Sequence, residues 1–165
     1  MNIKKIIFII SITLNISLIF LSFLIYNKIN DGKESAANEI QHQLIALEKA
    51  IGEEMEASWS KPENVDKQFK VSLETMNRSL DLIDELSIGR KKEYDLTWSF
   101  LKTLEAYKRN DFYKNNKFTS QGIENLEKLR SLLRDEGFGN GISITMNDYE
   151  EFISKIDSLN KKTSN

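Results

Sequence analysis

The first part of the chain is a run of twenty uncharged residues, from Ile6 to Ile25. As a helix this run would be about 30 Å long, which matches the hydrocarbon core of a bilayer. Fifteen of its residues are Ile, Leu or Phe. Each of these favours insertion by about 0.3–0.6 kcal/mol, which outweighs five small polar side chains. The pattern predicts a transmembrane helix over 6–26, after a short tail at 1–5.

The flanks of this run favour an uncleaved signal-anchor over a cleaved signal peptide. A signal peptide has an apolar stretch of about 7–15 residues that small residues follow closely. Here the run is longer, and the small residues at 35–37 lie beyond several charges. Lys4 and Lys5 precede the run, whereas Lys28 and Lys33 follow it. By the positive-inside rule, the paired lysines on a very short tail lead us to expect a cytoplasmic N-terminus and an extracytoplasmic remainder.

One narrow stripe of the predicted span carries most of its polar side chains. The stripe consists of Ser11, Asn15, Leu18 and Ser22. An amide in a bilayer is costly without a partner, and a hydrogen bond between two helices contributes about 0.6–2 kcal/mol. The stripe is therefore a candidate for self-association into a homo-oligomer. The alternative is that Asn15 bonds to the backbone of its own helix.

Beyond the span, apolar residues recur every three or four positions in five segments, which predicts amphipathic helices. We expect a juxtamembrane linker over 27–33, a soluble bundle over 34–160 and a disordered tail over 161–165. The first soluble helix starts outside the membrane or runs on from the span. In chain order, the inward-facing stripes are Ile40, Leu44, Leu47, Ile51, Met55 and Trp59; Val65, Phe69, Leu73, Met76, Leu80 and Ile83; Tyr94, Trp98, Leu101, Leu104 and Tyr107; Ile123, Leu126, Leu129 and Leu133; and Tyr149, Phe152, Ile153, Ile156 and Leu159.

Start and stop signals separate these segments. Ser60 and Glu63 form a capping box around a proline, Thr119 is suited to begin a helix, and Gly137 is suited to end one. Residues 142–145 are an extended piece or a loop. The stripes keep no common heptad register, so a single long coiled coil is not expected. The predicted fold is all-α: one N-terminal transmembrane helix followed by an antiparallel bundle of four or five helices.

Alternating helix directions would place two basic loops at opposite ends of this bundle. The loop nearer the membrane is a candidate contact for lipid headgroups, which attract each Lys or Arg by about 1 kcal/mol; it carries Arg90, Lys91 and Lys92. The distant loop is a candidate partner-binding site, because aromatic side chains beside cations are typical anchors. Its residues are Lys108, Arg109, Phe112, Tyr113, Lys114, Lys117 and Phe118. The alternative is that its aromatic residues plug the end of the bundle.

Composition excludes several kinds of chemistry. The chain has no cysteine and only one histidine, His42, so thiol catalysis is excluded and a catalytic triad would depend on that imidazole. The spacing of Glu39 and His42 matches a helical di-iron motif, but no second histidine exists. Carboxylates gather at 53–56 and 81–85, as expected for the solvated face of a helix. We expect no metal and no cofactor.

Charge and architecture give the expected function. Residues 34–165 carry nineteen Lys or Arg and twenty-four Asp or Glu, a net charge of about −5, which is unsuited to nucleic acid. We expect a non-enzymatic, single-pass membrane protein whose bundle docks onto another membrane or envelope protein. The alternative is a ligand-binding sensory bundle that acts through a partner, with Trp59, Tyr94 and Trp98 lining a pocket.

Overall fold

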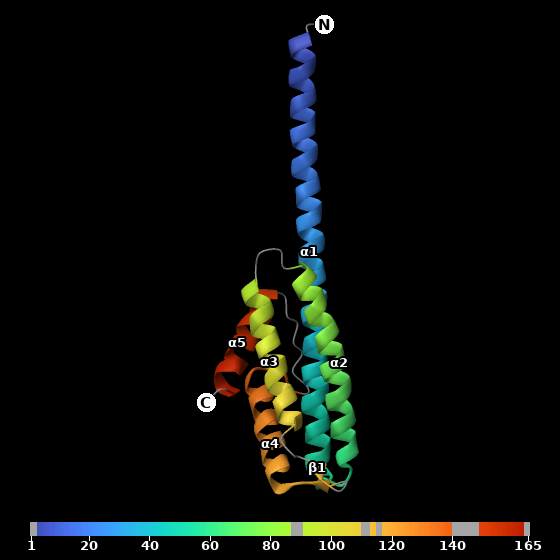
Figure 1. Ribbon diagram of the computed structural model, residues 1–165, viewed down its shortest axis with the longest axis vertical. Coiled ribbons are helices and arrows are strands. Elements are labelled where there is room, and N and C mark those ends of the chain that lie inside the picture. The colour runs from blue at the N-terminus through green and yellow to red at the C-terminus, as the bar shows by residue number, and fades with distance from the viewer. Residues whose placement is uncertain (1–2, 87–90, 110–112, 115–116, 140–148, 164–165) are drawn as a thin grey trace.

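A computed structural model of the chain shows, in the part that it describes, five helices and one short hairpin (Figure 1). It describes residues 3–86, 91–109, 113–114, 117–139 and 149–163. Of residues 108, 109, 113, 114 and 117 it describes only the backbone. The elements are α1 (Ile3–Glu56), α2 (Pro62–Leu86), α3 (Lys91–Arg109), β1 (Tyr113–Lys114), β2 (Lys117–Phe118), α4 (Ser120–Asp135) and α5 (Tyr149–Thr163). The predicted all-α fold, a long apolar N-terminal helix and a helical bundle, is confirmed.

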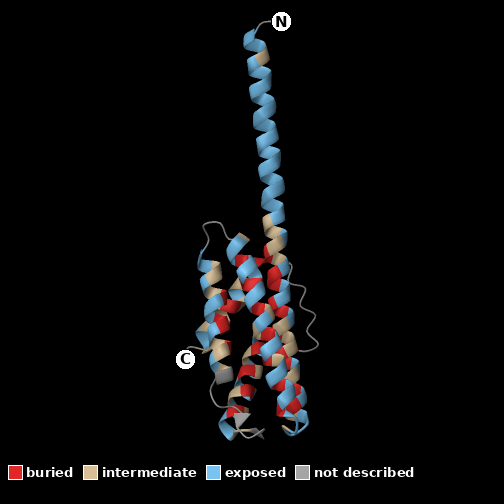
Figure 2. Cartoon of the chain, turned by 45° about the vertical axis from the view of Figure 1, so that its right-hand side comes forward, coloured by how far each residue is buried: buried red, intermediate tan, exposed pale blue. Residues whose placement is uncertain are grey.

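Helix α1 is unbroken from the apolar run into the centre of the bundle. Its first half stands alone and is exposed, whereas its second half carries buried residues (Figure 2). This helix is long and apolar enough near the N-terminus to span a membrane. The predicted linker over 27–33 is wrong, because these residues continue the helix and Lys33 at their end is buried. The first soluble helix therefore runs on from the apolar run.

Helix α2 folds back along the second half of α1 and returns to the level at which α1 enters the bundle. Gly32 of α1 allows the close approach there, since a Cβ atom at this position would lie 2.6 Å from Cδ1 of Leu86. We call this the near end of the bundle. Helix α3 then runs away from it, to the far end, where the α1–α2 turn and the β1–β2 hairpin lie (Figure 1).

Helices α4 and α5 share the remaining side of the bundle. Helix α4 starts at the far end and packs on α1 through Arg130, which bonds to Glu48. Helix α5 starts at the near end, where Tyr149 lies over Lys33 of α1. The two helices meet at their C-terminal ends, where Lys162 pairs with Glu136. Consecutive helices are antiparallel, but α5 runs parallel to its neighbour α3.

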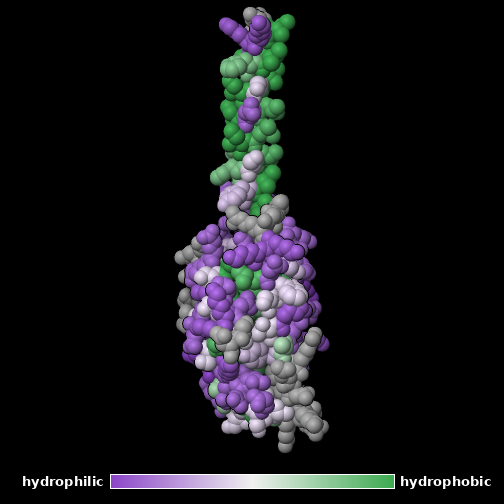
Figure 3. Space-filling model, turned by 60° about the vertical axis from the view of Figure 1, so that its left-hand side comes forward, coloured by the Kyte–Doolittle hydropathy of each residue, from purple (hydrophilic) through white to green (hydrophobic). Residues whose placement is uncertain are grey.

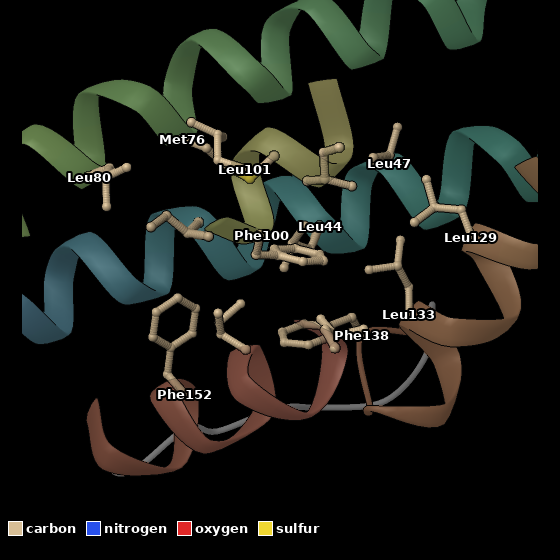
Figure 4. Packing of buried hydrophobic residues seen from close by; sticks show 14 of the residues in the cluster. Leu44, Leu47, Met76, Leu80, Phe100, Leu101, Leu129, Leu133, Phe138 and Phe152 are labelled. Atoms are coloured by element: carbon tan, nitrogen blue, oxygen red, sulfur yellow. The ribbon is translucent and has the colours of Figure 1, made fainter. Parts of the chain in front are cut away.

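The core follows four of the five predicted stripes closely. Large buried side chains of α2, α3, α4 and α5 gather around the buried side chains in the second half of α1 (Figure 4). The exception is in α3, where Trp98 was expected to face inward but is 45% exposed. Thr97 and Phe100 are buried instead, so the inward face of α3 is rotated from the one predicted. Lys102 lies over the exposed Trp98 ring, 5.3 Å from its centroid.

The turn between α1 and α2 is held by a buried carboxylate. Glu54 is 4% exposed and accepts hydrogen bonds from the backbone N–H of Lys61 and from Nδ2 of Asn64, at 2.9 and 3.1 Å. The expectation that carboxylates at 53–56 are all solvated is therefore wrong for Glu54. The Glu54 carboxylate therefore accepts hydrogen bonds from the start of α2, where the sequence predicted a capping box of Ser60 and Glu63.

Replacing Glu54 with Ala is expected to lower the free energy of unfolding by about 1–3 kcal/mol, because both hydrogen bonds from the start of α2 to this charged acceptor are lost. The matched control is Glu53→Ala, one residue away on the exposed side of α1. Its surface pair with Lys49 should contribute about 0.5 kcal/mol or less. Equal effects of the two variants in urea unfolding would contradict this account of the turn.

The remaining boundaries test three predictions. Thr119 caps α4 as expected, accepting from the backbone N–H of Gly122 at 3.0 Å. Gly137, beyond the end of α4, has the positive φ of 86° that favours glycine. The predicted disordered tail is wrong for 161–163, which continue α5 and include a hydroxyl bond from Thr163 to the carbonyl of Leu159. Residues 142–145 and 164–165 lie outside the described residues.

Candidate functional site

The far end of the bundle carries most of the predicted partner-binding loop. Lys108 and Arg109 end α3, and the chain then forms the antiparallel pair β1–β2. In this pair Tyr113 lies opposite Phe118, and Lys114 lies opposite Lys117. Like charges directly opposite each other on paired strands are destabilising. The backbone register therefore sets two lysine positions opposite each other at the far end of the bundle.

Aromatic packing fixes this hairpin to the α1–α2 turn. The rings of Trp59 and Phe118 meet edge to face, with centroids 5.2 Å apart and an interplanar angle of 79°. Ser58 and Trp59 have positive φ values of 54° and 58°, which are rare for residues with a side chain. Such strain persists only where surrounding contacts hold it. Phe118 thus plugs the bundle end, as the alternative reading expected, while Phe112 lies outside the described residues.

The near end carries the predicted lipid-contact residues. Lys91 and Lys92 are the first residues of α3 and are exposed, whereas Arg90 lies outside the described residues. The neighbouring Lys33 is seven residues beyond Tyr26, or about 10 Å along α1. Because the headgroup layer is about 6 Å thick, lysine side chains at this level are within reach of it. Lipid contact by these residues stays a prediction.

A buried ionic cluster at the near end joins α1, α3 and α5. The ammonium of Lys33 lies 3.0 Å from Oε2 of Glu93 and 5.3 Å from the centroid of the Tyr149 ring. The side chains of Lys33 and Glu93 are 8% and 19% exposed. Burial, with the neighbouring Glu93 carboxylate, raises the pKa of the Tyr149 hydroxyl. Sequence reasoning missed this cluster, because its members are distant in the chain and Lys33 resembles an ordinary flanking lysine.

The predicted association stripe lies on the exposed half of α1. Ser11, Asn15, Leu18 and Ser22 are all exposed. Nδ2 of Asn15 donates to the backbone carbonyl of Ser11 at 2.9 Å, which is the bond expected of a lone helix. The hydroxyl of Thr13 likewise donates a hydrogen bond to the backbone carbonyl of Ile9 in the same helix. These bonds satisfy part of the polar stripe without a second helix, and self-association stays a prediction.

The other residues considered for metal or ligand binding do not lie together in the structure. Among the described residues, no group of three or more acidic, His or Cys side chains is arranged to hold a metal ion. His42 is exposed on α1. The three residues expected to line a ligand pocket are in different surroundings: Trp59 packs at the far end, Tyr94 packs against the core, and Trp98 is exposed beside Lys102. The expected pocket among these three is therefore wrong.

No protein-family model, no curated protein and no solved structure matches the chain.

Proposed function

We propose that this protein is a single-pass membrane protein that presents a docking surface at a fixed height above the bilayer. The N-terminus lies in the cytoplasm and the bundle lies outside, as the paired lysines at 4–5 favour. No catalytic step is assigned to it. The observation that carries the proposal is the unbroken α1 helix, which passes from the apolar run into the core of the bundle.

A continuous helix makes the bundle a rigid extension of its anchor. Glu56 lies thirty positions beyond Tyr26, which corresponds to about 45 Å of helix. Leu44, Leu47 and Ile51, in the middle of this stretch, are completely buried against the other helices, so the stretch cannot bend without disturbing the core. The far end therefore stands at a defined distance from the lipid, where it can meet one surface of a neighbouring protein.

The far end has the chemistry of a docking surface for an acidic partner. The backbone register of its hairpin pairs the positions of Lys114 and Lys117, and two lysines at paired positions suit a partner that carries carboxylates. Phe118 and Trp59 hold the hairpin against the bundle, which limits the ordering cost of binding. An acidic patch on another envelope protein is the partner that this surface fits.

The test is capture of partners from membranes by the full chain carrying Lys114→Glu and Lys117→Glu. The proposal expects one reproducible partner of the wild type to be lost, because each charge pair would become repulsive. The matched control is Lys67→Glu with Lys70→Glu, which makes the same charge change on exposed positions of α2. Loss of the partner with both variants, or with neither, would contradict docking through the far end.

A further inference from the structure

The point at which α1 enters the bundle is enclosed by the ends of three other helices (Figure 1). Leu86 at the end of α2 lies so close to Gly32 that a Cβ atom there would be 2.6 Å from its Cδ1. Glu93 in the first turn of α3 and Tyr149 at the start of α5 both lie beside the ammonium of Lys33. Two consecutive residues of α1 therefore contact all three helix ends, at the level nearest to the apolar half of α1.

This near end has less apolar packing on α1 than the rest of the bundle. The first buried residues of α1 are Lys33, Ala36 and Ala37. The first buried side chain of α1 that is both large and apolar is Ile40, about two turns beyond Lys33. On the face in Figure 3, hydrophilic side chains surround the near end, next to the hydrophobic half of α1. The near end can therefore open locally while the apolar core farther along α1 stays packed.

The pair of Lys33 and Glu93 joins α1 to α3 at this end, and charged groups of this kind can exchange partners. Two charges gain their attraction at the cost of leaving water, so a buried pair contributes little net free energy. The carboxylate of Glu93 also faces the hydroxyl of Tyr149, whose pKa is raised by burial and by this carboxylate. When Lys33 leaves, Glu93 keeps this neighbour and lies in the first turn of α3, where the helix dipole stabilises a carboxylate.

The other partner within reach of Lys33 is the phosphate of a lipid headgroup. Lys33 lies about 10 Å along α1 from Tyr26, where the predicted span ends. Side chains of a helix lean toward its N-terminus, which is the membrane side of α1, and lysine carries its charge on a flexible four-carbon stem. Snorkelling in this direction brings the ammonium toward the headgroup layer. An anionic surface also attracts the exposed Lys91 and Lys92 at the same end of the bundle.

We propose that the buried ionic cluster of Lys33, Glu93 and Tyr149 responds to anionic lipid. The phosphate of an anionic headgroup takes Lys33 from Glu93, and the first turn of α5 then separates from α1. The charge of the membrane surface thereby sets how tightly the near end of the bundle is closed. This inference rests on the membrane placement in the proposed function, and it is independent of docking through the hairpin at the opposite end.

The experiment is hydrogen–deuterium exchange of the full chain in nanodiscs of phosphatidylcholine alone, and in nanodiscs of phosphatidylcholine mixed equally with phosphatidylglycerol. The readout is the amides of residues 153–155, which bond back to the first turn of α5. We expect them to exchange about fivefold faster with phosphatidylglycerol, the factor that corresponds to the attraction of one lysine by an anionic surface. The amides of residues 44–47, in the core, should be unchanged. Equal exchange at 153–155 in both lipids, or acceleration at 44–47 as well, would overturn the proposal.

Variants test whether Lys33 is the responding group. Lys33→Met with Glu93→Leu replaces the pair with apolar side chains, so exchange at 153–155 should no longer depend on lipid charge. Lys33→Gln removes the ammonium alone and should also abolish the dependence, which keeps the test valid if the double variant does not fold. The matched control is Lys28→Met, which removes an exposed lysine of the same helix and should retain the response. A response that persists without Lys33, or is lost with Lys28→Met, would overturn the assignment.

A dissolved phosphate offers the same chemistry as a headgroup, and a further arm distinguishes the two sources. Inorganic phosphate added to the phosphatidylcholine nanodiscs at constant ionic strength should leave exchange at 153–155 unchanged. Acceleration by inorganic phosphate alone would overturn the lipid as the source. Loss of the chain from the nanodiscs would contradict the proposed function as well, whereas a retained chain without the lipid response would contradict this inference alone.

Discussion

Replacing Arg130 with Met is expected to lower the free energy of unfolding of the bundle by about 3 kcal/mol. Nε of Arg130 lies 2.9 Å from Oε1 of Glu48, a side chain of α1 that is completely buried. The substitution removes this close partner, whereas Arg134, at 3.3 Å from the same oxygen, is half exposed. A buried charge that loses its main partner is among the most destabilising defects in a protein.

The same contact explains a glycine in the middle of α1. A Cβ atom on Gly52 would lie 2.7 Å from the Arg130 guanidinium, so the glycine leaves the space through which this side chain reaches Glu48. The guanidinium also lies 3.4 Å from the sulfur of Met55. The Arg130 side chain thus crosses the surface of α1 and adds polar contacts to the apolar packing of α4 on α1.

The double variant Glu48→Leu, Arg130→Met is the control for this prediction. Replacing a buried ion pair with apolar side chains is often neutral or stabilising, so the double variant should recover to within about 1 kcal/mol of the wild type. Urea unfolding followed by tryptophan fluorescence reports on the bundle, because both tryptophans lie outside the apolar run. A loss below about 1 kcal/mol for Arg130→Met alone would contradict the account.

Replacing Phe152 with Ala is expected to lower the free energy of unfolding by about 3–5 kcal/mol. Phe152 is completely buried and points from α5 toward α1 (Figure 4). Truncation removes both the burial of the ring and the contacts that fill its space. Because α5 is short, we also expect its backbone amides to exchange faster with solvent deuterium.

Val71→Ala is the control for Phe152→Ala. Val71 is 44% exposed on α2, so its truncation should change stability by about 0.5 kcal/mol or less. Similar losses for the two variants would mean that α5 does not pack on the core as described.

Hydrophobic spacing was sufficient to predict the helices and most of their inward faces. Leu44, Leu47 and Ile51 are buried as expected, because a helix with one apolar stripe removes it from water by packing that face against the other helices. The spacing failed in α3, where two overlapping stripes are available. One includes Trp98, and the one that the fold uses includes Phe100, while Trp98 stays outside with Lys102 over its ring.

Buried charges could not be predicted from the sequence. Glu48, Glu54 and Lys33 resemble solvated residues because charged side chains are rarely buried, and nothing near them in the sequence identifies their partners. Their burial depends on partners such as Arg130 and Glu93, which only the packing of α3 and α4 brings near. The predicted linker failed for the same reason, since Lys33 is fixed by a residue sixty positions later.

The measurement that tests the central claim most directly is the side of the membrane on which the bundle lies. The chain has no cysteine, so Asn116→Cys at the hairpin and Asn2→Cys at the N-terminus can each be probed in intact cells with a membrane-impermeant maleimide. The account predicts labelling of the Asn116 variant without lysis and of the Asn2 variant only after lysis. Labelling in the reverse order would place the bundle in the cytoplasm and contradict docking to an extracytoplasmic partner.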